Sequence, residues 1–345
     1  MTYVGIGGGQ NTYVPGTNWS ATGLLQAEYT RTQNSFALTK YAQLVPVTAS
    51  SGWYPRIQPV DAFRISSANQ FRWAEGSDAP TGKDQQVEWV QYTTARYAYP
   101  FQFSTKTAQQ AAWDIVASHA RQKAQLAMTD RARAVITALT TSGNWPTGNY
   151  FATAGAVSGG GSWSSSSTSQ RYIEHTIRGV CQAISKATGG VVGPKDINLV
   201  INPVQASNMA MTAEIQAYVV NNVNTINYQT GDEMYDLWGL PKRLFGVNVV
   251  VEDTVINTSI QGASSQTQGY VLGDAVAVFT TRIGGVVENQ AGPTLTTVQV
   301  NAFEDMTVEQ MDDTWNRTVK GRVVQDFAVT LPANLSGAYI ASTAS

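Results

Sequence analysis

The sequence predicts an α+β fold in which helices and strands follow one another without a repeating order. Three observations predict it. A long helical pattern covers residues 104–140, a Gly/Ser-rich stretch covers 155–169, and short apolar runs typical of strands recur up to the C-terminus. Helices and strands in such an order pack as segregated layers. With 345 residues, 43% of them hydrophobic, the chain is long enough for two domains with a substantial core.

The first 35 residues are rich in Gly, Thr and Asn and carry isolated aromatic side chains such as Tyr3, Tyr13 and Trp19. Such a segment buries too little apolar surface to fold alone. We therefore expect residues 1–35 to form an arm that is held down by something outside it.

Residues 36–99 have the pattern of β-structure without a core of its own. Strand-like runs at 42–47, 63–65 and 87–95 alternate with turn signals. Tryptophans and arginines are scattered along the segment, and these two residue types are enriched at the energetic centres of protein interfaces. This composition favours an inter-subunit contact over the alternative, a small β-subdomain with ordinary surface arginines. The candidate contact residues are Trp53, Arg56, Arg64, Arg72, Trp73, Lys83, Trp89 and Arg96.

The segment 104–140 predicts one long helix. Thr107 and Gln110 have the spacing of a capping box, and no Gly or Pro interrupts the run. At 1.5 Å per residue the helix would be roughly 50 Å long. A helical hairpin arm is the alternative. The apolar face of the predicted long helix is expected to comprise Trp113, Val116, Ala120, Ala124, Ala127, Met128, Arg131, Val135 and Leu139.

The second half of the chain predicts alternating helices and strands. An amphipathic helix from Tyr172 ends near Gly189, and Asn202 followed by Pro203 predicts the start of a helix that runs to about Val220. Buried strands are expected at 197–202, 247–254, 270–281, 294–303 and 322–331.

No sequence pattern supports catalysis or a cofactor. The two histidines, His119 and His175, lie inside predicted helices without clustered ligand partners, which favours structural roles. The glycines of residues 5–9 lack the strand and helix of a dinucleotide-binding turn. A weak cation site is one interpretation of the acidic run near residue 309, but a solvated helix face is favoured. The run comprises Glu304, Asp305, Glu309, Asp312 and Asp313.

Charge and cysteine content narrow the class of protein. Charged residues make up 13% of the chain, and 22 basic residues against 24 acidic ones give a net charge of −2. A basic surface that grips nucleic acid is therefore not expected. Cys181 is the single cysteine, so no intrachain disulfide forms. The N-terminal residues lack the pattern of a signal peptide, and no apolar run approaches the roughly 20 residues that span a bilayer.

Four segments, taken in order, resemble the major capsid proteins of tailed bacteriophages, which have the Hong Kong 97-type capsid fold. In that family an extended β-hairpin loop leads through an aromatic-rich strand into a long spine helix. A strand that ends in Asn-Pro, a strand of the type L-FGV-VVV and a strand that ends in Gly-Asp before an apolar run then follow. The matching segments are 96–139, INLVINPVQASNMAM (197–211), LWGLPKRLFGVNVVVEDT (237–254) and YVLGDAVAVFTT (270–281).

The resemblance implies an architecture and a set of partners. Residues 1–35 would be the N-terminal arm, 36–98 the extended loop, 99–150 with 285–325 the peripheral domain, and 165–284 with 326–345 the axial domain. The chain would assemble in the bacterial host cytoplasm into pentamers and hexamers of an icosahedral virion capsid. That shell would enclose double-stranded DNA without sequence-specific binding. Portal and scaffolding proteins are expected partners and a decoration protein is a further candidate, whereas a membrane and a cofactor are not expected.

Some members of this family join a loop lysine to an asparagine covalently. Lys83 is the only lysine in the middle of this loop, and Asn289, Asn301 and Asn316 are the acceptors available by region. No local motif supports such a pair, so we expect no cross-link.

Three alternatives to a phage capsid remain open at this stage. An encapsulin-type nanocompartment shell has the same fold but holds cargo enzymes. An extracellular β-rich surface or adhesion protein fits the low charge, but not the alanine-rich long helix or the absence of a signal-peptide pattern. An enzyme would require a deep pocket with convergent titratable groups.

Overall fold

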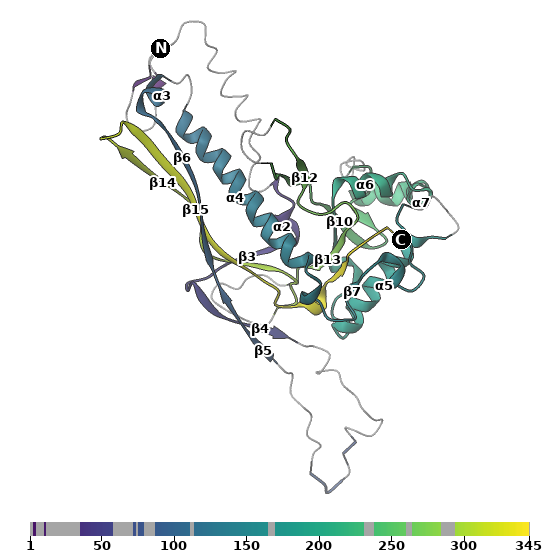
Figure 1. The fold of residues 1–345 in the computed structure, drawn as a ribbon. Coiled ribbons are helices and arrows are strands. Elements are labelled where there is room, and N and C mark those ends of the chain that lie inside the picture. The colour runs from purple at the N-terminus through teal and green to yellow at the C-terminus, as the bar shows by residue number, and fades with distance from the viewer. Residues whose placement is uncertain are drawn as a thin grey trace.

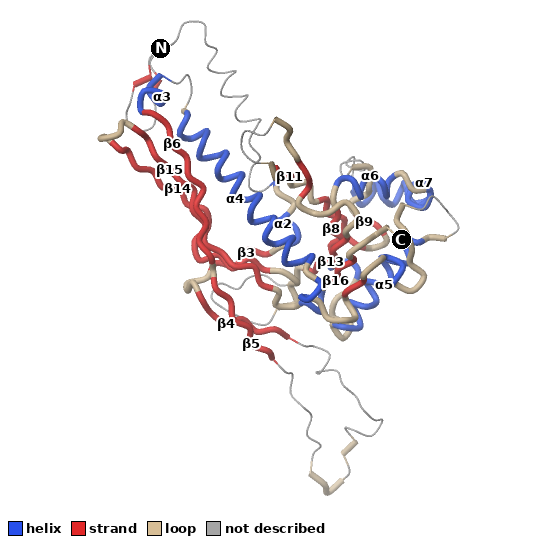
Figure 2. Tube along the Cα trace, viewed as in Figure 1, coloured by secondary structure: helices blue, strands red, loops and turns tan. Residues whose placement is uncertain are grey.

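The computed structural model describes residues 3–4, 10–11, 35–57, 72–73, 75–78, 87–110, 114–164, 170–230, 238–259, 264–283 and 294–344. Figure 1 shows an elongated molecule with a rounded domain at one end. A long, curved sheet accompanied by one long helix extends from that domain, and Figure 2 separates these strands from the helices by colour.

The rounded domain is built on a six-stranded sheet with the strand order β7-β16-β13-β8-β10-β9. Its central strands β8 and β10 run parallel. Both faces of the sheet are buried because side chains along each strand alternate between two hydrophobic clusters. In β8, Leu199 belongs to one cluster and Val200 to the other. The strands are β7 (Tyr150–Phe151), β8 (Ile197–Ile201), β9 (Arg243–Leu244), β10 (Val247–Val251), β13 (Ala277–Thr281) and β16 (Ala338–Ile340).

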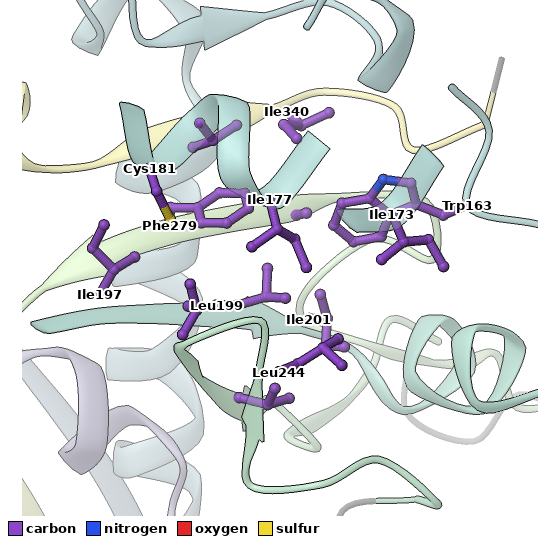
Figure 3. Packing of buried hydrophobic residues seen from close by; sticks show 14 of the residues in the cluster. Trp163, Ile173, Ile177, Cys181, Ile197, Leu199, Ile201, Leu244, Phe279 and Ile340 are labelled. Atoms are coloured by element: carbon purple, nitrogen blue, oxygen red, sulfur yellow. The ribbon is translucent and has the colours of Figure 1, made fainter. Parts of the chain in front are cut away.

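One face of this sheet is covered by α5 (Tyr172–Ala187), whose apolar stripe packs on the strands. Figure 3 shows Ile177 and Cys181 of α5 beside Phe279 and Leu199 of the sheet. The predicted second helix and the buried strand at 197–202 are therefore confirmed in position, with β8 ending one residue earlier.

The predicted helix 203–220 is wrong in its continuity. It forms two helices, α6 (Pro203–Ala210) and α7 (Ala213–Thr230). The Asn202 side chain accepts a 2.7 Å hydrogen bond from the backbone N–H of Gln205, so the predicted cap is present. Thr212 separates the two helices, because its hydroxyl oxygen accepts a hydrogen bond from the backbone N–H of Ile215 and so caps the start of α7.

The long sheet has four strands in the order β3-β14-β15-β6. They are β3 (Gln43–Pro46), β6 (Ala95–Ser104), β14 (Gln299–Asp313) and β15 (Thr318–Thr330). The strands predicted at 42–47 and 322–331 are present with small shifts, whereas the one predicted from 294 begins only at Gln299. The strand predicted over 270–281 is also wrong in extent, because regular structure resumes only at β13.

The helix predicted over 104–140 is wrong as a single element. The structure has α3 (Thr105–Gln110) and α4 (Ile115–Thr140), and Thr107 lies inside α3 instead of capping it. The cap of α4 is Asp114, whose Oδ1 accepts a 3.0 Å hydrogen bond from the N–H of Ala117. With 26 residues, α4 is about 39 Å long.

The two sheets share a core at the C-terminal half of α4. Val135 and Leu139 of α4 pack in one cluster with Val200 and Val250 from the rounded domain. The short helix α2 (Leu38–Tyr41) joins this cluster, and Tyr41 is completely buried. The prediction that residues 36–99 lack a core is therefore wrong for 36–46, and residues 95–98 belong to β6.

Three two-stranded ladders complete the regular structure: β1 (Tyr3–Val4) with β2 (Gln10–Asn11), β4 (Ser51–Ile57) with β5 (Val87–Thr93), and β11 (Val255–Asn257) with β12 (Gln268–Tyr270). Single-turn 3-10 helices are η3 (Ser142–Asn144), η4 (Ala154–Ala156), η5 (Pro194–Asp196) and η6 (Asn334–Ser336). The strand predicted at 63–65 lies outside the described residues, as do most of residues 1–35.

Candidate inter-subunit contact surfaces

The β4–β5 hairpin projects away from the body of the molecule (Figure 1). Its strands pair from Ser51↔Thr93 to Ile57↔Val87. None of the residues of this hairpin belongs to the hydrophobic clusters formed by the described residues. The interpretation of this part of the segment as β-structure without its own core is therefore confirmed.

One face of the hairpin carries two exposed indole rings. Trp53 is opposite Gln91 and Trp89 is opposite Pro55, so both tryptophans lie on the same face as diagonal neighbours. Their side chains are 59% and 60% exposed. Two solvent-exposed tryptophan side chains on one face are typical of the energetic centre of a protein interface.

The opposite face of the hairpin turns toward the long sheet. Tyr54 and Tyr92, together with Tyr97, Phe327 and Ala134, line a cavity of about 400 Å³ between hairpin and sheet. The Tyr92 ring lies over Gly52, where a Cβ atom would come within 2.9 Å of its hydroxyl oxygen. Gln91 and Thr93 of the tryptophan face also line this cavity, whereas the two indole rings are not among its lining residues and stay exposed.

The arginines of the predicted contact set differ in their surroundings. Arg56 lies within the hairpin, 3.5 Å from Glu88. Arg96 lies in β6 of the long sheet, where it contacts Glu304 and Asp326. The structure therefore does not place Arg96 with the tryptophans of the hairpin.

Beyond the hairpin, the structure describes only two short pieces of the loop. Arg72 and Trp73 lie in the first of them, and Trp73 is 65% exposed. Its indole N–H donates a 2.6 Å hydrogen bond to the carbonyl oxygen of Ser77. Arg64 and Lys83 lie outside the described residues.

Sequence reasoning missed a further exposed aromatic side chain, which lies outside the loop. Trp315 occupies the turn between β14 and β15 and is 93% exposed. Asp313 organises this turn, because its carboxylate accepts hydrogen bonds from the backbone and side-chain N–H groups of Asn316 and from Lys320 Nζ at 2.8 Å. These contacts, that of Lys320 first, hold the pKa of Asp313 below its usual range.

The turn that carries Trp315 has further internal constraints. Arg317 has a positive φ of 47°, and its carbonyl oxygen accepts from the N–H of Thr105 at the start of α3. The signal in the sequence was an Asp-Thr-Trp-Asn turn between two runs containing β-branched residues, and it was obscured by the acidic residues before it.

The acidic run is a strand, so the predicted helix face is wrong. All five carboxylates lie on β14. Four of them face cations from neighbouring elements: Glu304 with Arg96, Asp305 with Arg131, Glu309 with Arg322, and Asp313 with Lys320. Within the described part of the chain, no three acidic, histidine or cysteine side chains converge in a group that could hold a metal ion.

The titratable groups around a cavity beside α5 serve the fold. The cavity measures about 660 Å³ and is lined by Arg178, Glu174 and Glu214 among others. Glu174 pairs with Arg178 at 2.8 Å, and Glu214 accepts from the N–H groups of Ile173 and Glu174 at the start of α5. Their charge and hydrogen-bonding capacity are thus engaged with the chain itself.

The two histidines occupy different settings. His119 stacks on Phe103 and Phe101, with ring centroids 5.6 and 6.1 Å away, whereas His175 is exposed next to Gly159. Of the helices described, none is both long enough and apolar enough to cross a membrane.

A scan against protein-family models finds no match for this chain, and a search of curated proteins finds no similar sequence. Solved structures, in contrast, are similar over nearly the whole chain. A phage-related protein from Bordetella bronchiseptica RB50 has a TM-score of 0.60 and 13% identity, covering 92% of this chain and 94% of that one.

Two chains from phage capsids are similar in the same way. A chain of the capsid of the cyanophage P-SCSP1u has a TM-score of 0.53 and 11% identity, with 88% and 87% of the two chains covered. A chain of the mature capsid of bacteriophage PhiM1 has a TM-score of 0.53 and 13% identity, with 87% and 84% covered. These likenesses show the fold: the chain has the Hong Kong 97-type capsid fold that the resemblance in its sequence predicted.

Proposed function

We propose that this chain is the major capsid protein of a tailed bacteriophage, a non-enzymatic subunit that assembles into pentamers and hexamers of an icosahedral shell around double-stranded DNA. The observation that carries the proposal is the fold, which matches chains of phage capsids over 88% and 87% of this chain. A shared fold alone does not define a function, so the exposed surfaces of this chain supply the second line of support.

Those surfaces suit self-association. The tryptophan face of the β4–β5 hairpin and the Trp315 turn lie far apart on the molecule (Figure 1), and each presents aromatic surface to solvent. Two separate contact regions on one subunit allow it to contact several copies at once, whereas a single self-complementary region allows only pairs. A charge fraction of only 13% also fits a protein whose surface is largely covered by neighbours.

Within this proposal the domains acquire roles. Residues 1–35 form the N-terminal arm, and the extended loop corresponds to residues 47–94, a narrower range than the sequence predicted. The long sheet with α3 and α4 forms the peripheral domain, and the six-stranded sheet with α5, α6 and α7 forms the axial domain around the capsomer axes. Portal and scaffolding proteins, and a decoration protein, are proposed as partners in the virion.

The proposal is tested by purifying the protein and following its sedimentation as its concentration rises, with negative-stain electron microscopy of every fraction. Capsomers or closed shells are expected, because burying the exposed aromatic faces requires other copies. A clean monomer at every concentration would count against a shell protein. Nucleic acid in particles isolated from their natural source separates a virus capsid from a compartment that holds cargo enzymes.

A further inference from the structure

The β14–β15 hairpin consists of two regular parts joined by an irregular one. The first part pairs from Gln299↔Thr330 to Ala302↔Phe327. The second part pairs from Thr307↔Val324 to Asp313↔Thr318 and leads into the turn that carries Trp315. Between them only Glu304↔Asp326 is in register, with a shift on either side. A bulge bends the strand that contains it and increases its twist. The outer part, hereafter the distal arm (residues 307–324), is therefore joined to the rest of β14 through an irregular segment at residues 302–307, while β15 stays paired with β6 without a register shift across the same point.

Carboxylates of like charge meet at this bend. Glu304 is directly opposite Asp326 in the ladder, an arrangement that destabilises a sheet. Asp326 is only 6% exposed, and its Oδ1 has no hydrogen-bond partner among the described residues. Arg96, the partner of Asp326 on β6, lies 3.5 Å from Asp326 and 3.8 Å from Glu304. One guanidinium from a third strand therefore holds both carboxylates.

A second arginine reaches the same bend from α4. Arg131 is buried, and its Nη2 lies 2.8 Å from Asp305 Oδ1 within the irregular part of β14. Its Nε donates a 3.2 Å hydrogen bond to Gln325 of β15, and its guanidinium lies 5.5 Å from the centre of the Phe327 ring. Arg131 thus joins α4 to both strands where their own ladder is weakest.

We propose that Arg96 and Arg131 form a latch that fixes the angle of the distal arm relative to the rest of the subunit. Without it, the bulged part of β14 has few bonds to β15 at the bend, and the ladder between β15 and β6 is left as the one regular ladder that crosses it among the described residues. With it, three elements hold the bend at one angle and the Trp315 turn at one position. The latch stands on contacts within one subunit, and its effect on shell curvature rests on the proposed function.

The latch is tested on the full-length subunit by measuring distances between two spin labels. One label is placed at Thr314 in the exposed turn and the other at Lys195, which is exposed beside the six-stranded sheet, in a Cys181→Ala background. Labelled protein is diluted with excess unlabelled protein, so that only distances within one subunit are observed. A second labelled pair, Thr137 and Lys195, reports on a part of the subunit that the latch does not touch.

The test variant is Arg96→Gln with Asp305→Asn, which removes one charge of each sign at the bend. Both side chains are more than half exposed, so folding is expected to survive. The matched control is Arg322→Gln with Glu309→Gln, a cross-strand ion pair of the same type within the distal arm. Both variants keep the net charge of the chain, and circular dichroism checks the fold of each.

We expect the distribution of Thr314–Lys195 distances to become about twofold broader in the test variant and to stay unchanged in the control, since a released hinge samples several angles. The Thr137–Lys195 distribution should stay narrow in both. An unchanged Thr314–Lys195 distribution in the test variant, or equal broadening in the control, overturns the latch. If the test variant fails to fold, Asp305→Asn alone in 1 M salt, where the Debye length is about 3 Å, repeats the comparison.

The consequence for assembly is measured separately. Shells of the test variant should be more heterogeneous in diameter by electron microscopy than shells of the control. If the wild-type protein forms no shells, the proposed function fails while the distance measurement still decides the latch. If the distances broaden and the diameters do not, the latch holds and its role in curvature is wrong.

Discussion

The Tyr41 hydroxyl donates a 2.6 Å hydrogen bond to Glu252 Oε2, and both side chains are completely buried. The two residues come from α2 and from the end of β10. The other carboxylate oxygen of Glu252 accepts from the backbone N–H of Thr254 at 3.2 Å and from its hydroxyl. A carboxyl group inside the core thereby accepts three hydrogen bonds, and one of the donors, Tyr41, comes from a segment more than two hundred residues earlier in the chain.

Replacing Tyr41 by Phe keeps the ring and removes one of these donors. We expect the free energy of unfolding to fall by about 1–3 kcal/mol, because a buried acceptor loses its partner. Urea unfolding followed by circular dichroism measures the change. Tyr97→Phe is the control, since Tyr97 is partly exposed on the sheet and its ring contact with Phe327 is retained. Equal effects of the two substitutions would contradict the special role of Tyr41.

Stability should decline at alkaline pH. Burial raises the pKa of the Cys181 thiol from 9.0 to about 12, and burial together with the charge of Glu252 raises the pKa of Tyr41 well above 10.0. Both groups bind their protons more tightly in the folded state, so their contribution is complete below the unfolded pKa and is lost as the pH rises above it. Each group contributes a slope of at most about 1.4 kcal/mol per pH unit.

The measurement is denaturant unfolding at several values between pH 7 and pH 11. Cys181→Ala should remove the part of the decline that begins near pH 9.0, whereas Tyr41→Phe should remove part of the decline above pH 10.0. A free energy of unfolding that stays constant up to pH 11 in the wild type would show that these groups are accessible to solvent in the folded protein.

Trp53→Ser with Trp89→Ser should abolish shell formation without destabilising the subunit. Both side chains are exposed, so the free energy of unfolding should change by no more than about 0.5 kcal/mol. An interface anchor of this type contributes about 2–4 kcal/mol, and every subunit would repeat the loss. The control is Met211→Ser with Val220→Ser, which removes exposed apolar groups from the other domain. A normal yield of shells from the tryptophan variant would show that the hairpin face is not an inter-subunit contact.

Trp315→Ala tests the contact that sequence reasoning missed. Its side chain packs against almost nothing in its own subunit, so the melting temperature should not change. Shells should form more slowly and dissociate at lower denaturant concentration, as light scattering would show. A second measurement is the difference in tryptophan emission between the wild type and Trp315→Ala, which isolates Trp315 among the nine tryptophans of the chain: this emission should shift to shorter wavelength on assembly. If the emission keeps its position, this turn stays in water in the shell.

Free subunits should bind double-stranded DNA only weakly and without sequence preference. With 22 basic residues against 24 acidic ones, few phosphates are neutralised at once. Fluorescence anisotropy with two unrelated duplexes at physiological salt measures both affinity and preference. Submicromolar binding would reveal a basic surface that the overall charge conceals.

Local periodicity explains which elements could be predicted. In β8 and α5 the apolar residues recur at the spacing of their own structure, and both elements lie where the sequence predicts them. The full extent of β14 could not be predicted, and the reason is physical. Two register shifts interrupt the alternation of side chains between 302 and 307, so the acidic residues there and beyond lack the period of a strand and favour a helix face by sequence alone. Because the sequence does not predict this part of the strand, it does not predict the turn that exposes Trp315 either.

Two further features depend on contacts that are distant in sequence. Phe36 and Leu38 are buried in a cluster with residues of α4, about a hundred residues later in the chain. The local sequence around residues 36–38 does not indicate this distant partner. The break before α4 depends on one side chain, since Asp114 caps the helix without disturbing the apolar spacing around it. For the contact surfaces, the sequence identified the aromatic residues, whereas only the ladder register shows that Trp53 and Trp89 share a face.

Among the described residues, β14 beyond Ala302 has a neighbouring strand on one side only, and its other edge is open to water over residues 304–313. An open edge of this length is a template on which another chain can add a strand and begin an aggregate. Five carboxylates lie along it and four of them pair with cations, so an incoming strand would have to displace these charged groups and their hydration. The acidic run thus acts against aggregation through this open edge.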